Sequence, residues 1–190
     1  MPLPITSQVE QEWGIKMDLR IEKTKKCIIN AFIELRSKNE LEKITVKELC
    51  ENAQINKSTF YTHYHDIYDL SEQLENELVI SLMKELNHPE NVIESPAAFT
   101  HELFEGCLSK NSLINVLFSG TRSNLLIEKI EIALKNLIYN SYPQLENDIS
   151  QNIMLTYTIY GGYYAFYKNR KYGDEIVIEK IGELLTKLKL

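Results

Sequence analysis

The chain has 190 residues, of which 44% are hydrophobic and 25% charged, a composition typical of a globular protein and not of a disordered one. Its net charge of −6 argues against a wholly basic nucleic-acid binder. The chain has only 7 glycines and 5 prolines, which favours long helices with short connections over a many-stranded sheet. The composition therefore predicts an all-α fold.

The start of the chain and its cysteines indicate the compartment. Residues 1–17 lack the apolar core of a signal peptide, and we expect an N-terminal arm there with at most a short helical piece near Trp13. The chain contains no run of about 18 apolar residues, so we expect no membrane span. The three cysteines are odd in number and match no zinc-ligand spacing. We expect a cytoplasmic protein without a membrane segment, a metal or a cofactor.

Residues 18–66 are predicted to form a first domain, which opens with a long helix. Ile28, Phe32 and Leu35 recur at helical spacing, with basic residues on the opposite side. Residues 20–65 contain nine Lys and Arg against six Asp and Glu, a net charge of +3, which leaves −9 for the rest. A positive segment on an acidic chain is typical of a region that meets phosphate, although a solvated helix face can produce the same asymmetry.

Two short helices are predicted next. Thr45, followed three residues later by Glu48, has the form of a capping box ahead of a helix over about 46–52. Asn56 is a preferred N-cap residue for the following helix. Two helices of these lengths, joined by three or four residues after a longer first helix, form a helix-turn-helix.

The last of these helices has side chains suited to reading DNA. The N-terminal end of a recognition helix enters the major groove, and Lys57, Ser58 and Thr59 at this end can bond to base edges. Phe60 and Tyr64 are expected to lie in the core. The residues expected at phosphates are Thr45, Lys47, Tyr61 and His63. Tyr61 can alternatively be simple surface packing.

The whole string resembles a known family. The motif runs Thr45-Val46-x-x-Leu49-x-x-x-Ala53, then Ile55-Asn56-Lys57-Ser58-Thr59-Phe60-Tyr61-x-His63-Tyr64, then Asp69-Leu70. It resembles the N-terminal DNA-binding domain of the TetR/AcrR family of bacterial transcriptional regulators. The resemblance implies a homodimer that binds a palindromic operator through this domain. It also implies a variable helical C-terminal domain, here residues 67–190, that dimerises and binds a small-molecule effector.

Two positions depart from the family pattern. Gln54 stands where the family usually has glycine, so this residue must accept a positive φ or reshape the turn. Ile67 stands where the family usually has a lysine that meets phosphate, which puts one contact with the DNA backbone in question. Neither departure touches the positions expected to read bases.

Residues 67–190 are predicted to be helical throughout, with a long connecting helix over 67–86. Further helices are expected over 96–110, 112–117, 121–139, 146–168 and 174–188. The segment 153–167 is apolar or aromatic nearly all round, which indicates burial on more than one side. The glycines within it typically permit close approach of another backbone.

This second domain supplies candidate residues for an effector pocket and for a dimer interface. The pocket candidates are Phe104, Cys107, Phe118, Tyr157, Tyr160 and Tyr164, for which ordinary core or dimer packing is the alternative. The interface candidates, on the last two helices, are Ile153, Gly161, Gly162, Ile181 and Leu185. No charged residue stands out inside an apolar stripe, so the sequence indicates no charge for the ligand.

We therefore expect a homodimeric, sequence-specific transcriptional regulator, a repressor released by a small-molecule effector. The alternative is a family-like co-regulator that acts mainly through protein–protein contacts, which Ile67 and the acidic second domain would allow. No Ser/His/Asp, Cys/His or paired-carboxylate grouping has convincing local spacing, so an enzyme is not expected.

Overall fold

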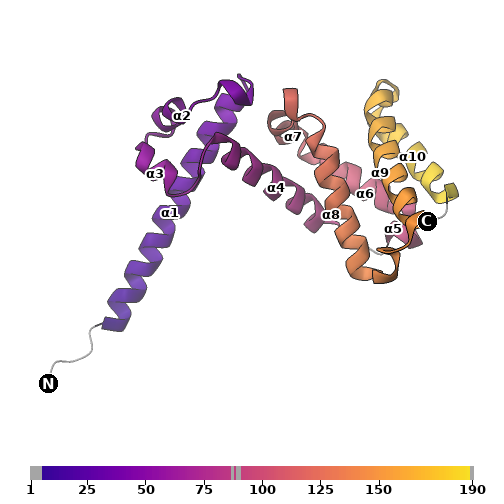
Figure 1. The fold of residues 1–190 in the computed structure, drawn as a ribbon, viewed down its shortest axis with the longest axis horizontal. Helices are drawn as coiled ribbons and strands as arrows, with labels where there is room; N and C mark the ends of the chain where they lie inside the picture. The colour runs from indigo at the N-terminus through magenta and orange to yellow at the C-terminus, as the bar shows by residue number, and fades with distance from the viewer. Residues whose placement is uncertain (1–5, 87, 89–90, 189–190) are drawn as a thin grey trace. The chain divides into compact units, whose positions relative to one another are not determined.

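The computed structural model describes residues 6–86, 88 and 91–188, and their regular structure is entirely helical (Figure 1). The absence of strands from this part of the chain confirms the predicted all-α class. The chain divides into two compact units, Met1–Glu72 and Gln73–Leu190, each described by itself below. No helix among the described residues is both long and apolar enough to cross a membrane.

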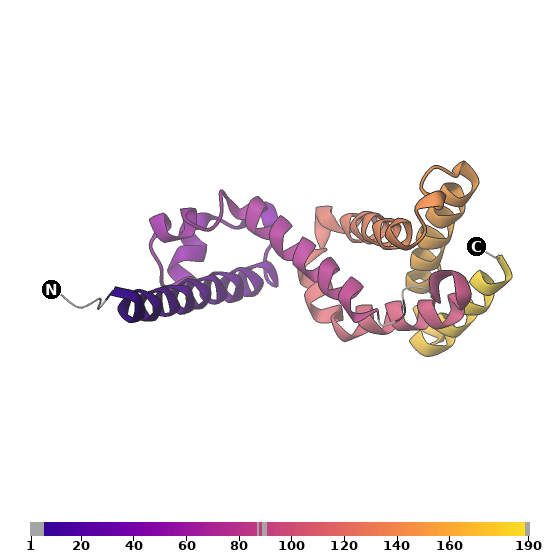
Figure 2. The same cartoon turned by 90° about the horizontal axis from the view of Figure 1, so that it is seen from below.

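The first unit places two short helices against a long one. Its elements are α1 (Thr6–Arg36), the 3-10 turn η1 (Leu41–Lys43), α2 (Val46–Ala53), α3 (Lys57–Tyr61) and the start of α4 (Ile67–Glu85). Both short helices lie on one side of α1 (Figure 2). Phe32 of α1, Leu49 of α2 and Phe60 of α3 are completely buried, so one shared core holds the three helices together.

The helix α1 begins earlier than expected. Residues 6–17 continue it back to Thr6, whereas the sequence predicts an arm over 1–17 with only a short helical piece; residues 1–5 of that arm lie outside the described residues. Residues 6–17 have no clear apolar stripe from which a helix could be predicted. It does hold straight-chain residues with high helix propensity, such as Gln8 and Glu12, and no proline, which is sufficient for helical backbone to continue.

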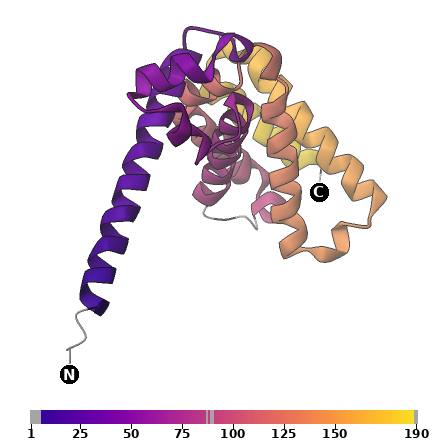
Figure 3. The ribbon, with the colours of Figure 1, turned by 60° about the vertical axis from the view of Figure 1, so that its left-hand side comes forward.

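The second unit contains the remaining helices. After α4 these are α5 (Asn91–Glu94), α6 (Pro96–Ser109), α7 (Asn111–Leu117), η2 (Gly120–Arg122), α8 (Leu125–Ser141), η3 (Pro143–Leu145), α9 (Ile149–Asn169), η4 (Arg170–Tyr172) and α10 (Asp174–Leu188). The helices predicted here are confirmed to within a few residues, and α5 is an addition. Helices α8 and α9 pack together, and α10 packs on both α9 and α6 (Figure 3).

The contact between α6 and α10 depends on a glycine. A Cβ atom built on Gly182 would lie 2.9 Å from the Cα of Ala97, a separation that real Cβ atoms do not adopt. Glycine at 182 therefore permits the two helix backbones to approach closely.

The buried face of α4 combines leucines with a charged residue. Leu78 and Leu82 are buried, as the spacing predicts, but Glu75 is also completely buried. Arg122 of η2 and Lys129 of α8 provide the positive charges that face this carboxylate. The sequence does not single out Glu75 as a buried charge, because its partners are too distant in the chain to be recognised.

Candidate functional site

The start of α2 offers a hydroxyl group to solvent. Thr45 is the N-cap, and its Oγ1 accepts a hydrogen bond from the backbone N–H of Glu48 at 3.2 Å, which confirms the predicted cap. Thr45 is exposed, and its own O–H can still donate to an incoming acceptor. Lys47 is also exposed, with its Nζ 4.0 Å from a carboxylate oxygen of Glu51.

The turn between α2 and α3 is made by a residue other than glycine in the left-handed region. Gln54 has φ 55° and ψ 44°, and its N–H donates to the carbonyls of Cys50 and Glu51. Of the two alternatives for Gln54, a positive φ or a reshaped turn, the first is the one observed. Asn56 occupies the N-cap position of α3, as expected, but its side chain makes no capping hydrogen bond.

The first turn of α3 carries the three residues expected to contact bases. Lys57 and Ser58 are exposed and Thr59 is half-buried, while the next residue, Phe60, is completely buried. Lys57 makes no ion pair within the described part of the chain, so its charge is available to a ligand. Burial of Phe60 fixes the rotation of α3 about its axis. In this orientation the side chains of Lys57 and Ser58 are exposed to solvent.

Two more of the predicted contact residues follow in and after α3. Tyr61 is 57% exposed, and its ring stands edge-on to Phe60 with the centroids 5.4 Å apart. His63 is half-buried, and its ring centroid lies 6.2 Å from that of the buried Tyr64. Packing on the core thus orients both rings, which keep polar atoms accessible to solvent.

A basic residue of α1 joins this surface. Arg20 and Thr24 line an open depression together with residues of α2, the turn and α3, and that depression includes Asn56 and Thr59. Arg20 is exposed. Nothing in the local sequence places Arg20 beside Thr59, because the two residues are far apart in the chain and only the packing of α1 on α2 and α3 brings them together.

The start of α4 places Ile67 in the core. Asp66 accepts the N–H of Asp69 at 2.8 Å and so caps α4. Ile67, next to it, is only 5% exposed. The position is therefore part of the core in this protein, and its side chain has no access to a phosphate.

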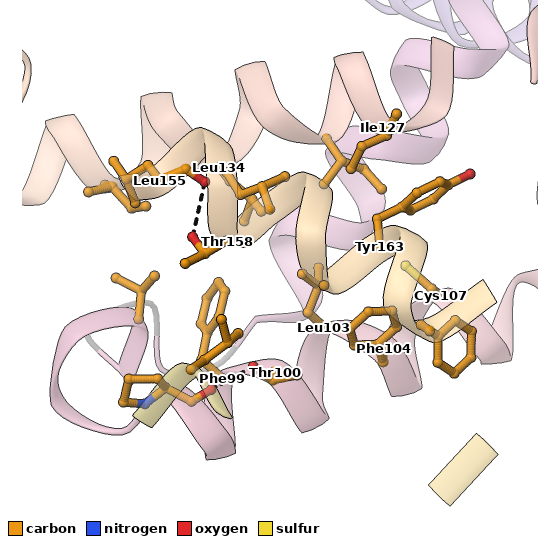
Figure 4. Close-up of a pocket in the computed structure, with 18 of the residues that line it drawn as sticks. Phe99, Thr100, Leu103, Phe104, Cys107, Ile127, Leu134, Leu155, Thr158 and Tyr163 are labelled. Carbon is orange, nitrogen blue, oxygen red and sulfur yellow. Dashed lines mark hydrogen bonds between the residues drawn. The ribbon is translucent and has the colours of Figure 1, made fainter. Parts of the chain in front are cut away.

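The second unit holds an interior cavity of about 80 Å³ between α6, α8 and α9, with contributions from α5 and α10 (Figure 4). Of the six pocket candidates, Phe104 and Cys107 line this cavity. The other four candidates, Phe118, Tyr157, Tyr160 and Tyr164, are not part of its wall. The aromatic residues that α9 does contribute are Tyr163, Phe166 and Tyr167.

The sequence does not indicate which side of α9 faces inward. Tyr157 is 67% exposed and Tyr164 is 43% exposed, while Gly162 and Phe166 are buried. Because α9 carries apolar or aromatic residues nearly all round, its sequence does not distinguish the inner face from the outer one.

The polar atoms of the cavity wall are already satisfied or neutral. Thr100 donates to the carbonyl of Pro96 at 2.7 Å, and Thr158 donates to the carbonyls of Met154 and Leu155 at 2.9 and 3.0 Å. Burial raises the pKa of the Cys107 thiol to about 12. Burial likewise raises the pKa of Tyr163 to about 12, so neither group ionises near neutral pH.

The predicted interface residues are divided between two faces. Ile153 is 65% exposed and Gly161 is also exposed, with open space around a Cβ built on it. Gly162 and Ile181 are buried against each other within the same chain, and Leu185 lines the cavity. The last three residues are therefore part of the core and the cavity wall of the unit.

Comparison with known proteins gives no family model that matches the chain, no similar curated protein and no similar solved structure.

Proposed function

We propose that this protein is a homodimeric, DNA-binding transcriptional regulator of the TetR/AcrR type, with α2 and α3 as a helix-turn-helix. One observation carries the proposal. Lys57 and Ser58 project from the first turn of α3 into solvent, while Phe60 is completely buried and fixes the helix. A helix held in this way presents its N-terminal side chains to a major groove, where Lys, Ser and Thr bond to base edges.

The surroundings of α3 support phosphate contacts on either side of the bases. Thr45 can donate a hydroxyl hydrogen bond at the start of α2, and the exposed phenol of Tyr61 can do so from the end of α3. Lys47 and Arg20 add positive charge that attracts any DNA sequence. The absence of a lysine at position 67 removes one contact from this set.

A dimer is part of the proposal, because a palindromic operator needs two recognition helices about 34 Å apart. Ile149, Ile153 and Tyr157 are 77%, 65% and 67% exposed and recur every four residues along α9. Large apolar side chains in such a row are costly to leave in water, which supports α9 as part of an interface between two copies.

The last part of the proposal is a small-molecule effector. A ligand that binds the cavity of the second unit more tightly in one conformation shifts the population toward that conformation. Release from the operator follows when the favoured conformation holds the two recognition helices at an unsuitable spacing. The protein then acts as a repressor relieved by its ligand.

The test is selection of bound sequences from a random pool of double-stranded DNA, using the purified full-length protein. We expect enrichment of a palindrome with half-sites about one helical turn apart. A gel shift on the enriched site then compares Ser58→Ala, in α3, with Ser112→Ala, an exposed serine in α7. Loss of affinity in the first variant alone supports the proposal, and a pool without enrichment contradicts it.

A second candidate function is a co-regulator that works mainly through protein contacts. The burial of Ile67 favours this alternative, because a buried apolar side chain makes no contact with a DNA phosphate. Under this alternative the pool shows no enrichment, and the protein co-elutes with a partner regulator in size-exclusion chromatography in the absence of DNA.

A further inference from the structure

The cavity of the second unit is long. Its wall on α6 runs from Pro96 to Cys107, and its wall on α9 runs from Leu155 to Tyr167. At about 1.5 Å per residue these stretches extend roughly 16 and 18 Å. A volume of about 80 Å³ distributed along such a wall makes the cavity narrow. A flexible chain fits this shape better than a set of fused rings.

Among the residues that the structure describes, those lining the wall include none with a charge. The nearby cation of Arg170 lies 5.3 Å from the ring centroid of Phe166, but it is held by two hydrogen bonds to Asp174, at 2.9 and 2.7 Å. An ionised ligand would lose its hydration on entering without gaining an ionic partner, which is strongly unfavourable. The wall therefore selects for an uncharged molecule.

The two ends of the cavity differ in chemistry. In Figure 4, Tyr163 and Cys107 lie toward one end, while Leu134 and Leu155 lie toward the other. The ring of Tyr167, also in the wall, has its centroid 4.6 Å from that of Tyr163. The phenols of Tyr163 and Tyr167 are hydrogen-bonded to each other, and together with the thiol they retain the capacity to bond a hydroxyl or carbonyl group. The described residues at the opposite end offer hydrocarbon and threonine hydroxyls that bond to backbone carbonyls.

We propose that this cavity binds an uncharged molecule with a single flexible hydrocarbon chain and one hydroxyl or carbonyl group. The polar group lies near Tyr163, Tyr167 and Cys107, and the chain extends toward Leu155. The inference deepens the proposed function, and rests on it in so far as this molecule is the effector. Binding itself is measurable without DNA, so the two claims can fail separately.

The first experiment is calorimetric titration of the full-length protein with 1-butanol, 1-hexanol, 1-octanol and octanoate at pH 7.5. Each methylene that enters the apolar wall should lower Kd roughly fourfold. Octanoate, with the same chain and a charged head, should bind at least tenfold more weakly than 1-octanol. Equal or tighter binding of octanoate, a Kd independent of chain length, or no binding of any alcohol would overturn the proposal.

The second experiment uses two helical glycines as a matched pair, one in the cavity wall and one outside it. Gly162 of α9 lines the cavity, and a Cβ there meets only Ile181 at an ordinary 3.7 Å, so Gly162→Ala can fold. Gly106→Ala adds the same methyl group and the same helix propensity in α6, outside the cavity wall, where a Cβ meets Leu82 and Glu85 at an ordinary 3.6 and 3.7 Å. We expect Gly162→Ala to raise the Kd for 1-octanol roughly fourfold, because the methyl takes the place of one methylene. Gly106→Ala should leave it unchanged, and equal affinities would contradict the assignment.

A gel shift with the selected operator separates the outcomes. If 1-octanol binds but operator affinity stays constant, the ligand class stands and the effector part of the proposed function fails. If the operator is bound but no alcohol enters the cavity, the ligand class fails and the DNA-binding function stands.

Discussion

The carboxylate of Glu75 in α4 receives two hydrogen bonds from the guanidinium of Arg122 in η2, at 2.6 and 2.7 Å, and is completely shielded from solvent. The Nζ of Lys129 in α8 lies 3.8 Å from the same carboxylate. The pair ties α4 to the segment that leads into α8, whose residues Leu126, Ile127 and Ile130 line the cavity. Two elements distant in sequence are thus joined by charge within the second unit.

Removal of Arg122 should destabilise the protein strongly. Arg122→Ala leaves a buried carboxylate with one more distant cation, and we expect a loss of about 3 kcal/mol in the free energy of unfolding. The measurement is urea denaturation followed by circular dichroism. Lys38→Ala, which breaks an ion pair on the surface of α1, is the control and should have no measurable effect. The double variant Glu75→Leu/Arg122→Met should recover much of the loss, and a double variant as unstable as Arg122→Ala would contradict this account.

Substitution in α3 should change which DNA sequences are preferred. Thr59→Ala removes a hydroxyl and a methyl group from the end expected to read bases, at an expected loss of about 1–3 kcal/mol in binding and with relaxed preference at one position of each half-site. Tyr61→Ala should weaken binding to all sequences alike, because a phenol at phosphate reads no base. Gel shifts on the selected operator and on single-base variants distinguish the two. Wild-type operator affinity in both variants would rule out α3 as the reader.

The salt dependence of DNA binding should show whether Lys47 contacts a phosphate. A lysine at phosphate releases counterions, so Lys47→Met should reduce the slope of log K against log salt by about 1. Fluorescence anisotropy with a labelled operator from 50 to 200 mM salt measures this slope. Lys187→Met, in the last helix, serves as the control and should leave the slope unchanged; equal slopes for all three proteins would remove Lys47 from the interface.

The turn residue Gln54 should tolerate replacement by glycine with a gain in stability. A side chain in the left-handed region costs roughly 1–2 kcal/mol, part of which glycine recovers, so Gln54→Gly should stabilise the protein by about 1 kcal/mol. Asn52→Gly, two residues earlier and inside α2, should instead destabilise it by roughly 0.3 kcal/mol. Urea denaturation of both variants makes the comparison, and a loss of stability in each would show that Gln54 is not strained.

Introduction of a lysine at position 67 should harm this protein. Ile67 is 5% exposed, so Ile67→Lys loses apolar burial and forces an ammonium group toward the core, at a cost of about 2 kcal/mol. Tyr68→Lys, at the neighbouring and 49% exposed position, adds the same charge without that cost. Thermal unfolding should show a lower Tm for the first variant only. An unchanged Tm together with tighter DNA binding would mean that position 67 reaches phosphate after all.

Helix boundaries were predictable where a local signal sets them. The N-cap of Thr45 on Glu48 and the Pro96 that begins α6 act within a few residues, so sequence spacing captures them. The start of α1 was not predictable in this way, since no cap or apolar stripe marks residues 6–17. The exposed first turn of α3 and its buried Phe60 also follow from local spacing.

The cavity and the charge cluster depend on relations that no local pattern contains. The inner face of α9 is set by the packing of α6, α8 and α10 around it, and a helix that is apolar nearly all round accepts more than one rotation. Glu75 meets an arginine 47 residues away, and Arg20 approaches Thr59 only because α1 folds against α2 and α3. These contacts belong to the tertiary structure alone.

The close approach at Gly182 has a mechanical consequence. Because Gly182 has no Cβ, α10 packs closely on α6 at Ala97, and we expect a displacement of one helix to carry the other with it. Since α6 forms one wall of the cavity, a ligand that pushed this wall outward would then also displace the C-terminal helix. Occupancy of the proposed ligand site would thereby be converted into movement of the protein's outer surface.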